Sequence, residues 1–143
     1  MDIFTKIKEL GFPPDQYIVV GSGILAAKGI RQTNDLDIVV TPELFDKCKA
    51  EGWEVLPWTK ESIPGKDWLK KGEIEVYVQL SRKSGGISAT ELLKKAEIIE
   101  GIPFITLESL IDFKREYGRP KDFEDIKVIE ACLKNTLPKP IVA

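Results

Sequence analysis

The chain has 143 residues, of which 43% are hydrophobic and 31% are charged, a composition that predicts one globular domain over residues 1–143. The net charge of −2 excludes the strongly basic character of a general nucleic-acid or membrane-surface binder. The absence of histidine from the sequence excludes Ser–His and Cys–His mechanisms and histidine-ligated zinc.

In the first half of the chain, apolar runs with helical spacing alternate with short continuous apolar runs that are typical of buried strands. Gly11, Gly29 and Gly52 end the expected helices, and Thr41 with Pro42 begins one. The expected elements are, in order, a helix over 2–10, a strand over 17–20, a helix over 24–28, a strand over 36–40, a helix between Thr41 and Gly52, and a strand over 53–56.

The second half begins with an irregular segment, residues 57–72, for which we expect a loop or a partly formed strand. Residues 73–80 alternate apolar and polar side chains and predict one strand. Further on we expect a polar loop over 81–86, a helix from Ser88 to about 96, two short strands within 98–105, helices over 107–117 and 121–133, and a loosely ordered tail over 135–143.

Strands that alternate with helices predict the α/β (α+β) class, with a mixed β-sheet flanked by helices. The sequence has no apolar stretch of 18 residues and no apolar leader, so we expect neither a membrane span nor a signal peptide. Cys48 and Cys132 lie far apart without CxxC spacing, which favours a reducing compartment. We therefore expect a cytoplasmic protein.

Two motifs could carry chemistry. Gly21-Ser22-Gly23 ends a strand and opens a helix, an arrangement that binds phosphate through backbone N–H groups, although Ser22 could equally just cap the helix. Asp35 and Asp37 begin the next strand, and residues i and i+2 of a strand point to one face. Such a pair is typical of a divalent cation site, the alternative being a solvated strand end.

Glu75 is the third candidate carboxylate, in the middle of the strand over 73–80. If that strand lies next to the strand over 36–40, Glu75 completes a three-carboxylate cluster of the kind that holds metal ions for phosphoryl-type transfer. If it does not, Glu75 belongs to a solvent-exposed polar face that it shares with Glu73 and Gln79.

The run from Gly21 to Asp37 resembles the signature of the nucleotidyltransferase (DNA polymerase β-like) superfamily. Its Arg-x-Thr-x-Asp-Leu-Asp portion is most similar to the AbiEii-type branch, as is the later segment 110–126. The resemblance implies a nucleotidyltransferase fold with C-terminal helices. It also implies a site in which Asp35, Asp37 and Glu75 are catalytic and bind Mg²⁺ or Mn²⁺, and Gly21, Ser22, Arg31 and Lys114 bind the nucleotide. Families of this fold usually have Asp where this chain has Glu75.

We therefore expect a Mg²⁺-dependent enzyme that transfers a nucleoside monophosphate from a nucleoside triphosphate to a hydroxyl acceptor, which is a small molecule, a protein or a tRNA. One alternative is a non-catalytic nucleotide-binding or toxin–antitoxin-like partner module of the same fold. Another is a structural domain whose Asp35 and Asp37 are ordinary surface carboxylates. The sequence identifies neither the acceptor, the preferred base nor the oligomeric state.

Overall fold

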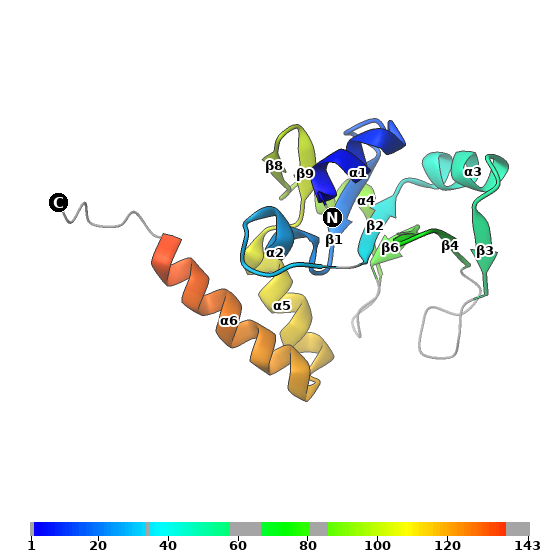
Figure 1. Ribbon diagram of the computed structural model, residues 1–143. Coiled ribbons are helices and arrows are strands. Elements are labelled where there is room, and N and C mark those ends of the chain that lie inside the picture. Colours follow the sequence, from blue (N-terminus) through cyan, green and yellow to red (C-terminus); the bar gives the residue numbers. More distant parts are fainter. Residues whose placement is uncertain (1, 34, 58–66, 81–85, 137–143) are drawn as a thin grey trace.

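The computed structural model describes residues 2–33, 35–57, 67–80 and 86–136 (Figure 1). Its helices are α1 (Ile3–Leu10), α2 (Gly23–Ala27), α3 (Pro42–Ala50), α4 (Ala89–Leu93), α5 (Leu107–Tyr117) and α6 (Pro120–Thr136). Its strands are β1 (Tyr17–Val20), β2 (Leu36–Val40), β3 (Glu54–Leu56), β4 (Trp68–Lys71), β5 (Ile74–Tyr77), β6 (Gln79–Leu80), β7 (Ile87–Ser88), β8 (Glu97–Ile99) and β9 (Ile102–Phe104).

Within the described residues, seven strands form one mixed sheet in the order β3-β4-β5-β2-β1-β9-β8, and β6 pairs with β7 in a separate ribbon. The pairs β2–β5 and β1–β9 are parallel, whereas β1 and β2 run antiparallel. Because β1 and β2 are interior strands with helices nearby, their side chains are almost all buried, which explains their continuous apolar sequences.

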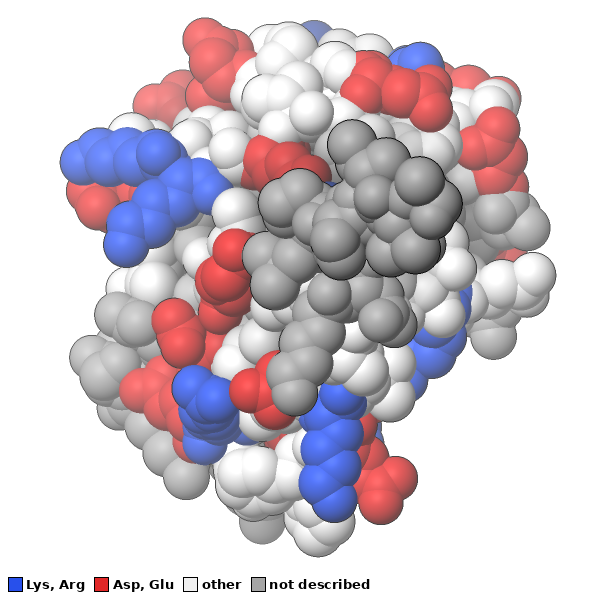
Figure 2. All heavy atoms as spheres, turned by 90° about the vertical axis from the view of Figure 1, so that its left-hand side faces the viewer, with Lys and Arg blue, Asp and Glu red and all other residues white. Residues whose placement is uncertain are grey.

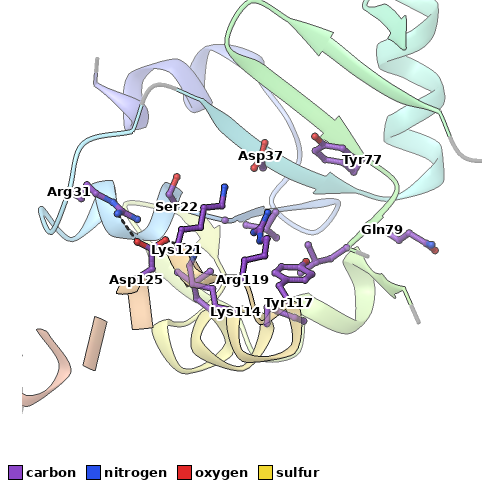
Figure 3. Close-up of a pocket in the computed structure, with 15 residues that line it drawn as sticks. Ser22, Arg31, Asp37, Tyr77, Gln79, Lys114, Tyr117, Arg119, Lys121 and Asp125 are labelled. Atoms are coloured by element: carbon purple, nitrogen blue, oxygen red, sulfur yellow. Dashed lines mark hydrogen bonds and ion pairs between the residues drawn. The ribbon is translucent and has the colours of Figure 1, made fainter. Parts of the chain in front are cut away.

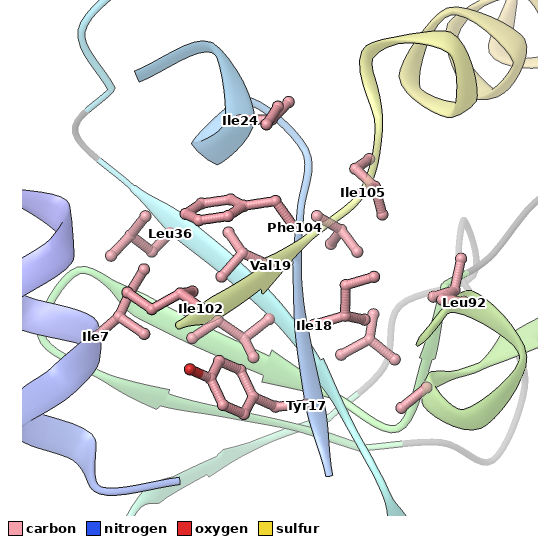
Figure 4. Packing of buried hydrophobic residues seen from close by; sticks show 14 of the residues in the cluster. Ile7, Tyr17, Ile18, Val19, Ile24, Leu36, Leu92, Ile102, Phe104 and Ile105 are labelled. Carbon is pink, nitrogen blue, oxygen red and sulfur yellow. The ribbon is translucent and has the colours of Figure 1, made fainter. Parts of the chain in front are cut away.

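Alternate residues of β1 point to opposite faces of the sheet. Tyr17 and Val19 point toward the face on which α1 packs, whereas Ile18 points toward α4 (Figure 4). On the α1 face, the ring of Phe4 meets the ring of Phe104 edge-on, with 6.2 Å between ring centroids. Val20 shares the face of Ile18, because side chains two residues apart in a strand point the same way.

The C-terminal helices α5 and α6 pack side by side as a hairpin (Figure 1). Thr106 caps α5 by accepting a hydrogen bond from the backbone N–H of Ser109, and Gly118 ends it in the left-handed conformation, with φ +65°. α6 then begins at Pro120, at a position where the missing N–H of proline is tolerated. In the described residues, no helix is long and apolar enough to cross a bilayer.

The structure confirms the predicted α/β (α+β) class with a mixed sheet flanked by helices and two C-terminal helices. The prediction of a single strand over 73–80 is wrong, because the chain bends at Val78 and separates β5 from β6. The apolar–polar alternation continues across this bend, so the pattern carries no sign of it. Beyond Val78, Gln79 and Leu80 pair with Ser88 and Ile87 of β7 instead of continuing in the main sheet.

Other differences concern the ends of elements. In the segment for which we expected a loop or a partly formed strand, Trp68 to Lys71 form β4, which pairs with both β3 and β5. Residues 58–66 lie outside the described residues. α6 continues to Thr136, so the first two residues of the expected loose tail, Asn135 and Thr136, are helical; residues 137–143 lie outside the described residues. Residues 81–85 of the expected polar loop also lie outside the described residues.

Candidate active site

Asp37 and Glu75 lie directly opposite each other on the neighbouring parallel strands β2 and β5. Asp37 also lies opposite Val20 of β1, so all three side chains share the face of the sheet that α4 covers. A three-carboxylate cluster requires that the strand of Glu75 lie next to the strand of Asp37. This condition is met, since β5 is the immediate neighbour of β2.

The Asp37 carboxyl is the group in this cluster whose ionisation is most strongly perturbed. Burial raises its pKa, and the nearby negative charges of Glu75 and Asp35 raise it further, to about 7. Asp35 itself is exposed, just before the first residue of β2. Burial and the charges of Glu75 and Asp35 therefore all disfavour the ionised form of Asp37.

Tyr77 extends the site along β5. Its hydroxyl donates a hydrogen bond of 2.6 Å to Oε1 of Glu75, two residues earlier on the same face. The Tyr77 ring is itself positioned by stacking on the ring of Trp68 of β4, with 5.7 Å between ring centroids. Burial raises the pKa of Tyr77, and the bond to Glu75 raises it further, so Tyr77 keeps its proton and donates it in the hydrogen bond to Glu75.

Two glycines allow the turn between β1 and α2 to lie against the carboxylate cluster. Gly21 has φ +65°, and a Cβ atom there would lie 3.1 Å from Oδ2 of Asp37. At Gly23 a Cβ atom would lie 2.5 Å from Cγ1 of Val19, so only glycine lets α2 pack so closely on β1. The turn therefore brings its backbone close to Asp37.

Ser22 does not cap α2, because its side chain makes no hydrogen bond to that helix. Its Oγ instead lies 2.9 Å from Oγ1 of Thr33, and the Thr33 hydroxyl donates a bond of 2.9 Å to the backbone carbonyl of Asp35. A chain of hydroxyls thus connects the glycine turn with the segment that carries Asp35.

A cavity of about 480 Å³ opens between the part of the sheet that carries Asp37 and the two C-terminal helices (Figure 3). One part of its lining is polar and charged, and the other part is apolar and aromatic. The polar part consists of Gly21, Ser22, Arg31, Asp37, Lys114, Arg119, Lys121 and Asp125. The remainder consists of Val20, Tyr77, Gln79, Leu80, Leu110, Phe113 and Tyr117.

The floor of the polar part is an ion-pair network in α5 and α6. Asp125 accepts hydrogen bonds of 2.9 Å from Arg31 and from Lys114. Lys114 also lies 3.8 Å from Oδ1 of Asp122, which is fully buried. Arg119 closes the network by donating from Nε to Asp122 over 2.6 Å and from its backbone N–H over 3.1 Å.

Burial and hydrogen bonding shift the pKa values of both aspartates in this network, Asp122 and Asp125. Asp122 is buried, and its hydrogen bonds from Arg119 hold its pKa below the usual value. For Asp125, burial raises the pKa, but hydrogen bonds from Arg31 and Lys114 outweigh burial and leave the pKa lowered. Both carboxylates are therefore ionised partners of the largely buried Lys114 and of two more exposed arginines, Arg31 and Arg119.

The structure brings most of the predicted site residues to one place. Gly21, Ser22, Arg31, Asp37 and Lys114 line the cavity together. Asp35 and Glu75 are not part of its lining, but both are close enough to raise the pKa of Asp37. In the described part of the chain, no three Asp, Glu or Cys side chains form a group that would by itself hold a metal ion.

Sequence reasoning missed Tyr77 and Lys121 as site residues. Tyr77 carried a usable signal, since it lies two residues after Glu75 and must share its face in a strand. Lys121 carried none, because its position over the cavity depends on how α6 packs against α5.

No protein-family model matches the sequence, and no curated protein matches it. Two solved structures do match the fold. One is ANT(2″)-Ia in complex with adenylyl-2″-tobramycin, with a TM-score of 0.52 and 15% sequence identity over 92% of this chain and 85% of that chain. The other is a candidate nucleotidyltransferase from Thermotoga maritima, with a TM-score of 0.53 and 20% identity over 93% of this chain and 91% of that chain. At such identities the likeness extends to the fold alone, and the AbiEii-type branch stays a prediction.

Proposed function

Because the chain has the nucleotidyltransferase fold, we propose that it transfers a nucleoside monophosphate from a nucleoside triphosphate to a hydroxyl-bearing acceptor. The observation that carries the proposal is the pairing of Asp37 with Glu75 on neighbouring parallel strands, beside a cavity that cationic side chains line. Transfer at a phosphorus centre requires positioning and charge neutralisation above all, and this arrangement offers groups for both.

The carboxylate cluster fits Mg²⁺ or Mn²⁺, since its donors are all oxygen atoms. Burial raises the pKa of Asp37, and the negative charges of Glu75 and Asp35 raise it further; this second cause supports the assignment, because a divalent cation would offset it. Asp35 and Asp37 would hold the cation, with Glu75 as a third candidate ligand and phosphate oxygens completing the shell. When bound, such a cation neutralises the triphosphate during in-line transfer.

The chain's own residues bind the phosphates and move the proton. We assign the phosphates to the turn at Gly21 and Ser22, with Arg31 and Lys114 as supporting positive charge. Glu75 accepts the proton of the acceptor hydroxyl as its oxygen attacks the α-phosphorus. A new oxygen–phosphorus bond forms, the bond from the α-phosphorus to the bridging oxygen breaks, and pyrophosphate leaves with the bonding electrons.

The second candidate function is a non-catalytic nucleotide-binding module or a toxin–antitoxin-like partner. The glutamate at position 75 favours it, because that side chain already accepts the Tyr77 hydroxyl. The interpretation of Asp35 and Asp37 as independent surface carboxylates has lost its main support, since it required β5 to lie far from β2.

Surface charge bears on the acceptor. Acidic and basic side chains are interspersed on the face that Figure 2 shows, and its described residues form no continuous basic surface. A tRNA-sized polyanion needs such a surface for its phosphates, so this face favours a small-molecule or protein acceptor.

Calorimetry with ATP, GTP, CTP and UTP in the presence of Mg²⁺ or Mn²⁺ tests the proposal, combined with a pyrophosphate-release assay. We expect the wild type to bind at least one of the four, and Asp35→Ala/Asp37→Ala to lose that binding. Asp46→Asn is the matched control, because Asp46 is an exposed carboxylate of α3 away from the cavity. Absence of binding by the wild type would overturn the proposal, and binding without pyrophosphate release for small-molecule, protein and tRNA acceptors would favour the non-catalytic module.

A further inference from the structure

Four cationic side chains line the cavity, and three of them are already paired with carboxylates. Arg31 is bonded to Asp125, Lys114 lies between Asp125 and Asp122, and Arg119 is bonded through Nε and NH2 to Asp122. The three cations share these two carboxylates, so together they offer a phosphate much less positive charge than three unpaired cations would. Their arrangement holds α6 against the rest of the fold.

Lys121 is the fourth cation, and it differs from the others. Within the described residues, it takes part in no ion pair. Its side chain extends from α6 toward the part of the cavity that Ser22 and Asp37 line (Figure 3). Its exposed ammonium group therefore keeps its full charge and its three hydrogen-bond donors for a ligand.

The neighbouring residue Asp122 sets the position of Lys121. Asp122 is buried and accepts a hydrogen bond of 3.1 Å from the backbone N–H of Arg119, which secures the first turn of α6. Since Asp122 is also bonded to the Arg119 side chain, the backbone at Lys121 is held, whereas its exposed side chain has no ion-pair partner among the described residues. Such a residue can follow a phosphate chain without disturbing the fold.

We infer that Lys121 binds the phosphates of the nucleotide directly, whereas Arg31 and Lys114 position α6 over the site through Asp125. The ligand is a nucleoside triphosphate, whose negative charge needs a cation that no carboxylate already occupies. The inference rests on the proposed function and names the phosphate-binding side chain of the same site.

The test is calorimetry of Mg²⁺–ATP, or of whichever Mg²⁺–triphosphate the wild type binds, with full-length wild type, Lys121→Ala and Lys127→Ala. Lys127 is an exposed lysine of the same helix that does not line the cavity, so its removal changes net charge equally. We expect Lys121→Ala to weaken binding about tenfold, which is the scale of one charge-assisted hydrogen bond, and Lys127→Ala to leave binding unchanged. Lys121→Arg should restore most of the affinity.

A probe without phosphates distinguishes a loss of phosphate binding from a general loss of affinity for the nucleotide. The corresponding nucleoside should bind the wild type and Lys121→Ala equally, because it offers the lysine no anion. Equal triphosphate affinities for the wild type and Lys121→Ala, or equal losses in Lys121→Ala and Lys127→Ala, would overturn the inference and leave the proposed function standing. If the wild type binds no triphosphate, the proposed function itself fails.

Discussion

Arg31 and Asp125 lie 94 positions apart in the sequence, and a hydrogen bond of 2.9 Å joins them. Arg31 belongs to the segment between α2 and β2, which leads into Asp35 and Asp37, whereas Asp125 belongs to α6. The second oxygen of Asp125 accepts a bond from Lys114 of α5. One carboxylate therefore connects both C-terminal helices to the segment that precedes the candidate metal ligands.

Replacing this carboxylate should destabilise the fold. Asp125→Asn leaves the half-buried ammonium of Lys114 without its nearest counter-charge, so we expect the free energy of unfolding to fall by about 1–3 kcal/mol. Urea unfolding measures the change. Glu130→Gln is the control, because the exposed Arg115–Glu130 pair should contribute about 0–1 kcal/mol. Equal changes in the two variants would show that the Asp125 network does not support the fold.

Asp37 should make the free energy of unfolding fall as pH rises. An ordinary ion-paired carboxylate has the opposite effect. Its pKa is about 7 in the folded chain and near its ordinary value of 3.8 when unfolded. Between these values the folded chain keeps a proton that the unfolded chain has released, so stability falls as pH rises. We expect Asp37→Asn to be more stable than the wild type at pH 8, by about 1–3 kcal/mol, and similar to it near pH 4.

Urea midpoints across that pH range, without divalent ions, measure this effect. Asp46→Asn should follow the wild type. Added Mg²⁺ should stabilise the wild type at pH 8 and leave Asp37→Asn unchanged, since a ligand of the folded state alone raises stability. Parallel pH profiles for the wild type and Asp37→Asn would contradict the raised pKa.

The chain offers a matched pair of glycines that isolates the contact with Asp37. Gly21 and Gly29 have φ +65° and +71°, so alanine is strained by a similar amount, about 1 kcal/mol, at each. A Cβ atom at Gly29 meets nothing within 4 Å, whereas at Gly21 it meets Oδ2 of Asp37. We expect Gly29→Ala to cost stability alone and Gly21→Ala to weaken Mg²⁺–triphosphate binding as well, measured by calorimetry. Unchanged affinity in Gly21→Ala would place the phosphates elsewhere.

The bond from Tyr77 to Glu75 should be measurable as a coupling energy. In a double-mutant cycle of Tyr77→Phe and Glu75→Ala, we expect an interaction of about 1 kcal/mol in unfolding free energy. Phenylalanine keeps the ring that stacks on Trp68, so Tyr77→Phe should fold normally. Additive effects of the two substitutions would show that the bond makes no net contribution.

The local parts of this fold were predictable because they depend on neighbouring residues. The apolar runs at 17–20 and 36–40 form strands with the expected bounds, and Thr41 and Thr106 cap helices through the next turn. The bend at Val78 was not predictable, since Val78 continues the alternation of β5 and only the pairing of β6 with β7 redirects the chain.

The candidate site was predictable in its residues rather than in its geometry. Asp37 and Glu75 are 38 positions apart, and nothing in either local sequence states that β5 pairs with β2. The burial of Asp122 was hidden for the same reason, because its charged neighbours in the sequence suggest an exposed helix face. Its partner Lys114 lies on another helix, and the contact exists only once α5 and α6 pack together.

The hydroxyl chain from Ser22 to Asp35 has a consequence for how a ligand arrives. The Thr33 hydroxyl has one proton and gives it to the carbonyl of Asp35, so the Ser22 hydroxyl must donate toward Thr33. Ser22 therefore turns lone pairs, not its proton, toward other neighbours. Under the proposed function, a phosphate oxygen that binds at this turn would have to reorient this hydroxyl, a rotation that takes only picoseconds to nanoseconds, and in doing so would release Thr33 from the glycine turn.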